Sequence, residues 1–299
     1  MSDPSCSIKR VKIVYFSGTG STARVADCFE KALHDRGINV SKHEIPFGNS
    51  SSSENCDEDL LIMLFAVHAL NAPEPIYEWI KETPPVNQIP AVVVSVSGGG
   101  EISPNTACRV ETIVRLSKKG YNVVYEHMLI MPCNVFVSTP DGLAIRLLNI
   151  LPLKVERIVG DFLSGTRRRT KPLLFDRALS VFGEMEKLGA HFFGRMIRAS
   201  EACNGCGWCA RNCPHANISL EHNRPRFGMR CVFCLKCIYG CPNHALKPGI
   251  MKFAVIKTGY NLKDVELRMA DVELDPVEKL AKEFYWKGVK SYLSETETK

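Results

Sequence analysis

The chain has 299 residues, of which 45% are hydrophobic and 23% are charged. This composition is globular, the length predicts about two domains, and no stretch approaches the ~20 consecutive apolar residues that cross a bilayer. The formal net charge of +6 counts every thiol as neutral, so it gives little support to nucleic-acid binding in a chain with 13 cysteines. Residues 1–10 contain no apolar signal segment, from which we expect a cytoplasmic protein.

The first half of the sequence alternates strand-like and helix-like segments. Five strands are predicted, at residues 11–16, 38–45, 60–66, 91–96 and 123–131, and the first of them is a short apolar run. Helices are predicted between them, and a further helix at 141–164 is expected to break at Pro152. This alternation predicts a parallel sheet with helices on both faces, and a ligand beyond the carboxyl ends of its strands.

The loop after the first strand consists only of glycine and hydroxyl-bearing residues, SGTGST. Backbone N–H groups at the start of the following helix favour an anion, and the hydroxyls can donate to phosphate oxygens. The loop has no lysine and no GxGxxG pattern, which argues against a P-loop and a dinucleotide site. We predict that it binds the phosphate of flavin mononucleotide (FMN), although a hydroxyl-rich helix cap without a ligand is the alternative. The predicted binding residues are Ser17, Thr19, Gly20, Ser21 and Thr22.

Two further loops follow the third and fourth predicted strands, AVHALNAP and SGGGE. Consecutive glycines let backbone approach a flat ligand closely. His68 could contact the pyrimidine edge of a flavin, but a lone loop histidine is more often solvated or a cap. Asn71 and Pro73 are predicted to start a helix. The residues assigned to the ligand in these loops are His68, Ala69, Asn71, Ser97, Gly98, Gly99 and Gly100.

Eight of the thirteen cysteines form two copies of the pattern C-x2-C-x2-C-x3-C-P, 28 residues apart. This spacing is typical of two-cluster iron–sulfur proteins, in which the fourth cysteine of each run ligates the other cluster. Zinc is the alternative, but the third and fourth cysteines of each run are surplus to a zinc ribbon. We therefore predict one 4Fe–4S cluster on Cys203, Cys206, Cys209 and Cys241, and a second on Cys231, Cys234, Cys237 and Cys213.

These motifs together resemble a known family. The SGTGST turn is similar to the FMN phosphate loop of flavodoxins, and the CNGCGWCARNCP and CVFCLKCIYGCP runs resemble those of bacterial ferredoxins. Their order resembles the flavodoxin–ferredoxin fusion proteins of anaerobic bacteria and archaea. The resemblance covers about residues 11–260. It implies an α/β fold, with a flavodoxin-like five-stranded doubly wound parallel sheet and a small α+β two-cluster ferredoxin domain. It also implies non-covalent FMN, two 4Fe–4S clusters and electron transfer.

One departure from that family concerns the flavin ring. Typical flavodoxins sandwich the ring between aromatic side chains of the second and third loops, which contain no aromatic residue here. The ring is then either more open or covered by another part of the chain. We predict that the ferredoxin module or a dimer partner covers it, with Phe136, Trp208 and Phe227 as candidates, although ordinary packing is favoured for each of them. Cys133, after the fifth strand, is expected near the flavin end of the sheet.

The sequence divides into four parts. We expect an FMN domain at 1–165, a helical linker at 166–200, a ferredoxin domain at 201–250 and an extension at 251–299 with one helix at 276–293. The basic run at 167–171 is interpreted as a solvated connector, with docking of an acidic partner or contact with nucleic acid as the alternative. Ile218 and Leu246 are predicted to form the small core of the ferredoxin domain.

The predicted function is electron transfer from a low-potential donor through two clusters to FMN, or the reverse, and on to an acceptor. A redox protein is the expected partner, and a homodimer stays open. The alternatives are an enzyme that reduces a bound quinone, pterin or corrinoid at the flavin, and a redox sensor. We expect no nucleic acid and no membrane span.

Overall fold

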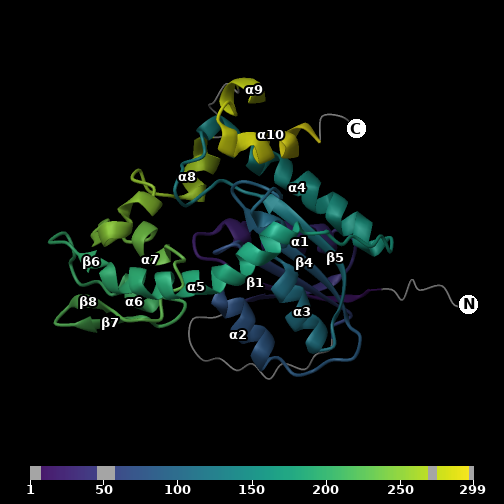
Figure 1. Cartoon of the computed structure of the whole chain (residues 1–299), viewed down its shortest axis with the longest axis horizontal. Helices are drawn as coiled ribbons and strands as arrows, with labels where there is room; N and C mark the ends of the chain where they lie inside the picture. The colour runs from purple at the N-terminus through teal and green to yellow at the C-terminus, as the bar shows by residue number, and fades with distance from the viewer. Residues whose placement is uncertain (1–7, 46–57, 269–274, 296–299) are drawn as a thin grey trace, which may run out of the picture.

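The computed structural model describes residues 8–45, 58–268 and 275–295. Five parallel strands form a sheet in the order β2-β1-β3-β4-β5 (Figure 1). Their bounds are β1 Arg10–Phe16, β2 Asn39–Glu44, β3 Leu60–Ala66, β4 Pro90–Ser97 and β5 Asn122–Ile130. This order is that of flavodoxin-like doubly wound sheets. The five predicted strands are thus confirmed to within one residue at each end. Four of them are largely buried, whereas β2 is a partly exposed edge strand.

Two pairs of helices cover the two faces of the sheet. Helices α1 (Ser21–His34) and α4 (Asp141–Leu163) contribute to one core, and α2 (Glu74–Glu82) and α3 (Val110–Lys118) flank the other. The central strand β3 is buried along most of its length, as expected for a strand covered on both faces. The carboxyl ends of β1, β3 and β4 therefore open at one edge, where the three predicted loops lie.

The predicted break at Pro152 is wrong. Helix α4 runs continuously from Asp141 to Leu163 with the proline inside it. Proline removes one backbone hydrogen bond, but Leu148, Leu151 and Val155 on both sides of it are buried in the core of the sheet. Packing of this apolar face outweighs the lost hydrogen bond and keeps the helix whole.

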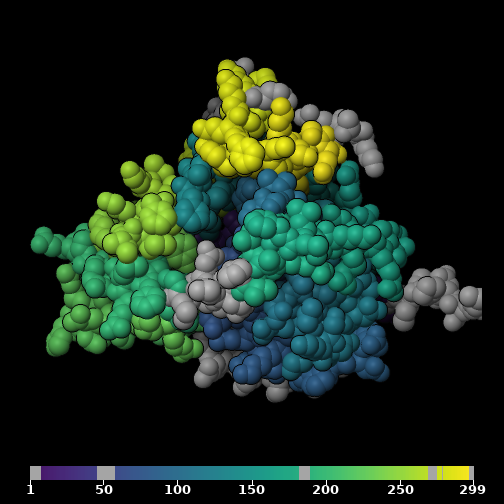
Figure 2. Space-filling model, viewed as in Figure 1, coloured from purple at the N-terminus to yellow at the C-terminus, as the bar shows by residue number. Residues whose placement is uncertain are grey.

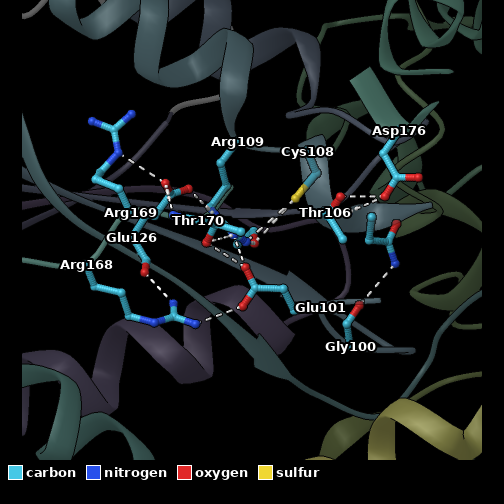
Figure 3. Close-up of polar contacts among 12 residues, drawn as sticks. Gly100, Glu101, Thr106, Cys108, Arg109, Glu126, Arg168, Arg169, Thr170 and Asp176 are labelled. Carbon is cyan, nitrogen blue, oxygen red and sulfur yellow. Dashed lines mark hydrogen bonds and ion pairs between the residues drawn. The ribbon is translucent and has the colours of Figure 1, made fainter. Parts of the chain in front are cut away.

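The basic run is not a solvated connector. Arg168 and Arg169 pair with Glu101 and Glu126, and the backbone at Arg168 bridges to Tyr125 on the edge strand β5. Figure 3 shows these side chains converging on the fully buried Arg109. The segment is thus held along the sheet edge by charges that the sequence alone did not place together.

After this segment, α5 (Leu174–Met196) leads into the cysteine-rich domain. Asp176 accepts hydrogen bonds from the Ser103 and Thr106 hydroxyls, both 2.5–2.7 Å away, so the start of α5 is tied to the loop after β4. The expected helical linker is one helix, and it crosses from the sheet to the lobe drawn at the left of Figure 1.

The cysteine-rich domain contains short elements arranged in two similar halves. Its strands are β6 (Arg198–Ala199), β7 (Ile218–Glu221), β8 (Arg224–Phe227) and β9 (Leu246–Lys247), and its helices are α6 (Trp208–Arg211) and α7 (Lys236–Tyr239). Strands β6 and β9 pair antiparallel, as do β7 and β8. Ile218 and Leu246 are buried as predicted, 7% and 5% exposed.

The C-terminal extension returns to the sheet. It contains a 3-10 segment (Gly249–Ala254), α8 (Leu262–Leu267), α9 (Val277–Leu280), a 3-10 turn (Phe284–Trp286) and α10 (Lys287–Ser294). The single helix predicted at 276–293 is wrong. The chain leaves the helical conformation at Ala281 and Glu283, which lets Trp286 and Val289 bury against the α4 side of the sheet. No described helix is long and apolar enough to span a membrane.

Candidate functional site

The eight motif cysteines surround two separate hollows. The first, which we call the distal hollow, is lined by Cys203, Cys206, Cys209 and Cys241. The second, the proximal hollow, is lined by Cys213, Cys231, Cys234 and Cys237. Each hollow thus combines three cysteines of one run with the fourth of the other, the combination that the crossed assignment predicts. Among the described residues, no three His, Cys, Asp or Glu side chains converge tightly enough to hold a single metal ion.

The backbone repeats its geometry around both hollows. Gly205 and Gly207 have φ of 73° and 72°, and their counterparts 28 residues later, Phe233 and Leu235, have φ of 54° and 59°. A non-glycine residue in this left-handed region costs of order 1–3 kcal/mol, and such strain collects at functional loops. Turns of this kind direct successive N–H groups inward, which suits an anionic cluster.

Backbone N–H groups also point at sulfur in both halves. The N–H of Asn217 donates to Cys213 Sγ, and the N–H of Ala245, 28 residues later, donates to Cys241 Sγ, both at 3.3 Å. Hydrogen bonds to ligand sulfur tune the potential of a cluster. The two cysteines that cross between the runs are therefore held by the same contact.

Burial makes the proximal thiols weak acids on their own. It raises the pKa of Cys231 to about 11 and that of Cys234 to about 12, and it also raises the pKa of Cys237, with the neighbouring cysteines as a smaller cause. Buried thiolates need a cation to compensate their charge. The cationic core of an iron–sulfur cluster supplies that compensation, so the donor set fits a cluster.

A cavity of about 460 Å³ lies at the carboxyl ends of the parallel strands. This volume is in the range of small-molecule and cofactor sites. Its walls come from the three predicted loops, residues 131–136, the last part of α5 and residues 231–235 of the cysteine-rich domain. The predicted flavin residues that line it are Ser17, Thr19, Ser21, Thr22, His68, Ala69, Asn71, Ser97, Gly98 and Gly99.

The other two predicted flavin residues, Gly20 and Gly100, do not line the cavity. Gly20 has φ of 100° and precedes α1, where it supplies the turn into the helix without a side-chain cap. Gly100 has φ of 93°, and an added Cβ would lie 2.8 Å from Ile130 Cδ1. Both glycines therefore shape the loops, and neither lines the cavity.

Hydroxyls of the first loop are tied to distant segments. Ser17 Oγ accepts from the N–H groups of Gly20 and Ala23, at 3.2 and 3.3 Å. The Asn134 amide donates to Thr19 Oγ1 at 2.7 Å, and Ser21 Oγ is 2.7 Å from the Tyr260 hydroxyl. The loop thus lines the cavity at the start of α1, while hydrogen bonds to Asn134 and Tyr260 hold its side chains. A phosphate there would meet backbone N–H groups first.

Tyr239 continues this network into the cysteine-rich domain. Its hydroxyl donates to the Asn134 carbonyl at 2.7 Å and accepts from the N–H of Ile256 at 2.9 Å, and its ring lies 6.0 Å from that of Tyr260. Sequence reasoning missed Tyr239 because it stands inside a cysteine run. Its position two residues after Cys237 is its one sequence signal.

His68 joins the second loop to the proximal hollow. Its Nδ1 atom lies 3.2 Å from the carbonyl oxygen of Val232, a residue between the motif cysteines Cys231 and Cys234. Burial lowers the pKa of His68 to about 4, although the contact with Val232 opposes this. The ring is therefore neutral at pH 7, with Nδ1–H as the donor. A structural contact replaces the solvated or capping role that we named as the alternative.

Asn71 does not start a helix. Its amide donates to the carbonyl of Ser180 in α5, at 2.7 Å, and α2 begins at Glu74 after Pro73. That prediction is therefore wrong for Asn71 and right for Pro73. Burial of Asn71 at 4% exposed explains the difference, since its polar atoms need partners inside the protein.

The cysteine-rich domain closes one side of the cavity. Phe136 lines the cavity, but Trp208 and Phe227 do not, so two of the three proposed covering residues are wrong. Trp208 lies against Gly240, and Phe227 packs in the small core of the domain. Phe233 and Met251 take that place instead. Phe233 is held edge-on to Phe193, with 4.5 Å between ring centroids.

The cavity and the proximal hollow share a wall. Cys231, Val232, Cys234 and Leu235 line both, whereas no residue of the distal hollow lines the cavity. Gly18 of the first loop approaches Cys234 so closely that an added Cβ would lie 2.9 Å from Cys234 Cβ and collide with its carbonyl oxygen. The proximal hollow therefore adjoins the cavity, whereas the distal hollow does not.

Comparisons with known proteins gave one family match and a set of similar solved structures. Residues 195–247 match the family model of the 4Fe-4S dicluster domain, and no curated protein matches. Solved structures similar to this chain include a flavodoxin from the domain Archaea (10% identity, 51% of this chain and 97% of that chain, TM-score 0.35). They also include oxidised flavodoxin 1 from Bacillus cereus (14%, 51% and 98%, 0.36) and a flavodoxin, WrbA-like protein from Agrobacterium tumefaciens (12%, 53% and 99%, 0.38). The strand order itself shows the flavodoxin-like fold.

Proposed function

Because the chain joins a flavodoxin-like domain to a 4Fe–4S dicluster domain, we propose that it is an electron-transfer iron–sulfur flavoprotein. Two 4Fe–4S clusters occupy the distal and proximal hollows, and FMN occupies the cavity. Electrons pass between the distal cluster, the proximal cluster and the flavin, in either direction. The flavin exchanges one or two electrons, so it connects one-electron carriers with an acceptor that takes one or two.

The shared wall carries this proposal. Cys231 and Cys234 are expected cluster ligands, and both also line the cavity in which we place FMN. The proximal cluster and the flavin are therefore neighbours, and no other described part of the chain separates them. The His68–Val232 contact and the close approach of Gly18 to Cys234 fix the two loops against each other.

The residues of the chain have distinct tasks in this scheme. The start of α1 binds the FMN phosphate through backbone N–H groups, and Gly98 and Gly99 bring backbone to the ring. His68, being neutral, adds no charge beside the flavin. Phe136, Phe233 and Met251 cover the side of the cavity that the loops leave open.

Cofactor content tests the assignment. The anaerobically purified chain is expected to contain about eight irons, eight acid-labile sulfides and one FMN. Cys213→Ser is expected to lose the cluster of the proximal hollow and retain that of the distal hollow. Eight irons in the variant would contradict the crossed ligand set, and a colourless zinc protein would contradict the function.

A second function is favoured by the wall formed by α5. Gly189, His191 and Glu74 all line the cavity. An added Cβ at Gly189 would have no atom within 4 Å, and His191 Nε2 lies 3.6 Å from Glu74 Oε2. A bound quinone, pterin or corrinoid could take electrons there, with His191 as a proton donor. Saturable reoxidation of the flavin by such a compound alone would favour this enzyme. Reoxidation only by a protein would favour the carrier.

A further inference from the structure

We propose that the surface around the distal hollow is the docking site for an acidic one-electron carrier protein. This surface, which we call the distal face, comprises Arg198, Arg211, Arg224 and Lys247 around Cys206 and Leu220. The inference rests on the proposed function, because it assigns a partner to the outer end of the electron path.

The distal hollow is the cluster site that a partner can reach. Cys206 is exposed, whereas the other seven motif cysteines are partly buried. Leu220, which also lines this hollow, is 43% exposed. In Figure 1 the elements α6, β7 and β8 lie at the end of the molecule away from the sheet, and Figure 2 shows this lobe projecting from the body. The flavin cavity lies on the opposite side of the proximal hollow.

Four cations lie on or beside the segments that line this hollow. The Arg211 guanidinium lies over Gly207 in the cysteine loop, where an added Cβ would be 2.8 Å from it. Arg224 Nη1 donates to the Ser200 carbonyl at 3.1 Å, just before Cys203. Arg198 and Lys247 stand directly opposite each other on β6 and β9. Like charges in that position cost stability, so fold stability does not explain the pair.

These four cations form no ion pair with any carboxylate of the described residues. Elsewhere on the surface, Arg24 pairs with Glu266 and Arg36 with Glu156. The cations of the distal face are thus available to a partner. Each of them is exposed.

The negative charge of the two clusters does not balance all of the positive charge of the cysteine-rich domain. Residues 195–252 contain nine Lys and Arg and only two acidic residues, Glu201 and Glu221. Two oxidised clusters with their eight thiolates contribute a charge of about −4. About three positive charges therefore remain on the loaded domain. A cationic rim around a small apolar centre suits a weak, fast redox encounter, in which charge steers association.

Nucleic acid fits the distal face less well than an acidic protein. Single-stranded binding surfaces combine cations with exposed aromatic side chains on which bases stack. Trp208, the aromatic residue that lines this hollow, packs against Gly240. Because the distal face has cations but no exposed aromatic side chain for bases to stack on, carboxylates of an acidic protein suit it better.

Binding kinetics of the loaded, full-length chain test the proposal. The probe is an acidic bacterial-type ferredoxin at low ionic strength. The variant Arg211→Glu with Lys247→Glu reverses two charges of the distal face, and Lys118→Glu with Arg157→Glu is the matched control on exposed sites of α3 and α4. We expect the association rate constant to fall about tenfold or more in the first variant and to change less than about twofold in the control. Added salt should remove the difference.

Equal rates in the two variants would overturn the proposal, as would tighter binding of a single-stranded oligonucleotide through the same residues. Iron and FMN are measured in each preparation. If Arg211→Glu with Lys247→Glu loses iron, Arg211→Gln with Lys247→Gln gives the same test, with about half the effect on the logarithm of the rate expected. Absence of clusters or FMN from the wild-type chain would contradict the proposed function instead. Cofactor content is measured separately from the association rates, so the two failures are distinguishable.

Discussion

The Nδ1 atom of His68 lies 3.2 Å from the carbonyl oxygen of Val232, which links the loop after β3 to the cysteine loop of the proximal hollow. Val232 is 7% exposed, so its carbonyl loses a buried partner if the ring is removed. His68→Leu is expected to destabilise the protein by about 1–3 kcal/mol. His68→Asn, whose amide can donate from nearly the same position, should recover part of this loss. Anaerobic urea unfolding gives both values, and equal stability of the Leu and Asn variants would contradict the hydrogen bond.

Gly18 lets the first loop touch the cysteine-rich domain. A methyl group there collides with the backbone of Cys234, and overpacking of this kind costs about 1–3 kcal/mol. We expect Gly18→Ala to lower the unfolding temperature and to weaken FMN retention in gel filtration. Gly160→Ala in α4 is the control, since Gly160 does not line the cavity and has no atom within 4 Å of an added Cβ. Identical behaviour of the two variants would show that the close contact is absent.

Arg109 is the centre of the buried charge cluster in Figure 3. Its Nε donates to Glu126 at 2.8 Å, it also pairs with Glu101, and its side chain is 1% exposed. Arg109→Met leaves these carboxylates without their buried partner, which is expected to cost about 3–5 kcal/mol. Arg268→Met removes an exposed pair with Asp141 and should cost no more than about 0.5 kcal/mol. Similar losses in denaturant unfolding would mean that Arg109 is not part of a buried network.

His127 makes stability depend on acid. Burial, helped by the nearby Arg168, lowers its pKa from 6.5 to about 3. Between these values the unfolded chain binds a proton that the folded chain does not bind, so stability falls as the pH falls. From about pH 6.5 to about 5.5 the wild type should lose about 1 kcal/mol more than His127→Phe. Urea unfolding at the two pH values measures this difference, and parallel losses would mean that protons reach the folded ring freely.

The sequence predicted the parts of this protein that are repeated or periodic. Buried strands are apolar runs, and the 28-residue repeat of the cysteines indicated the crossed grouping that the hollows display. Long-range contacts were not predictable in this way. Nothing adjacent in sequence pairs Arg109 with Glu126, ties Ser21 to Tyr260 or brings Phe233 to the cavity.

The errors have a common physical cause. Tertiary packing outweighed local propensity at Pro152, where a buried apolar face keeps the helix continuous, and at Ala281, where the chain breaks so that Trp286 becomes buried. Two of the three candidate covering residues, Trp208 and Phe227, do not line the cavity for the same reason. Trp208 instead packs against Gly240 within the cysteine-rich domain, where the absence of a side chain leaves room for its ring.

The central claim is that one chain carries an internal electron path between the distal hollow, the proximal hollow and the FMN cavity. Rapid anaerobic mixing with a one-electron reductant, followed at the flavin absorption band, tests it most directly. We predict that the flavin is reduced after the clusters, at a rate independent of protein concentration, and that Cys234→Ser abolishes this phase. A rate that rises in proportion to protein concentration, or one unchanged in Cys234→Ser, would contradict the account.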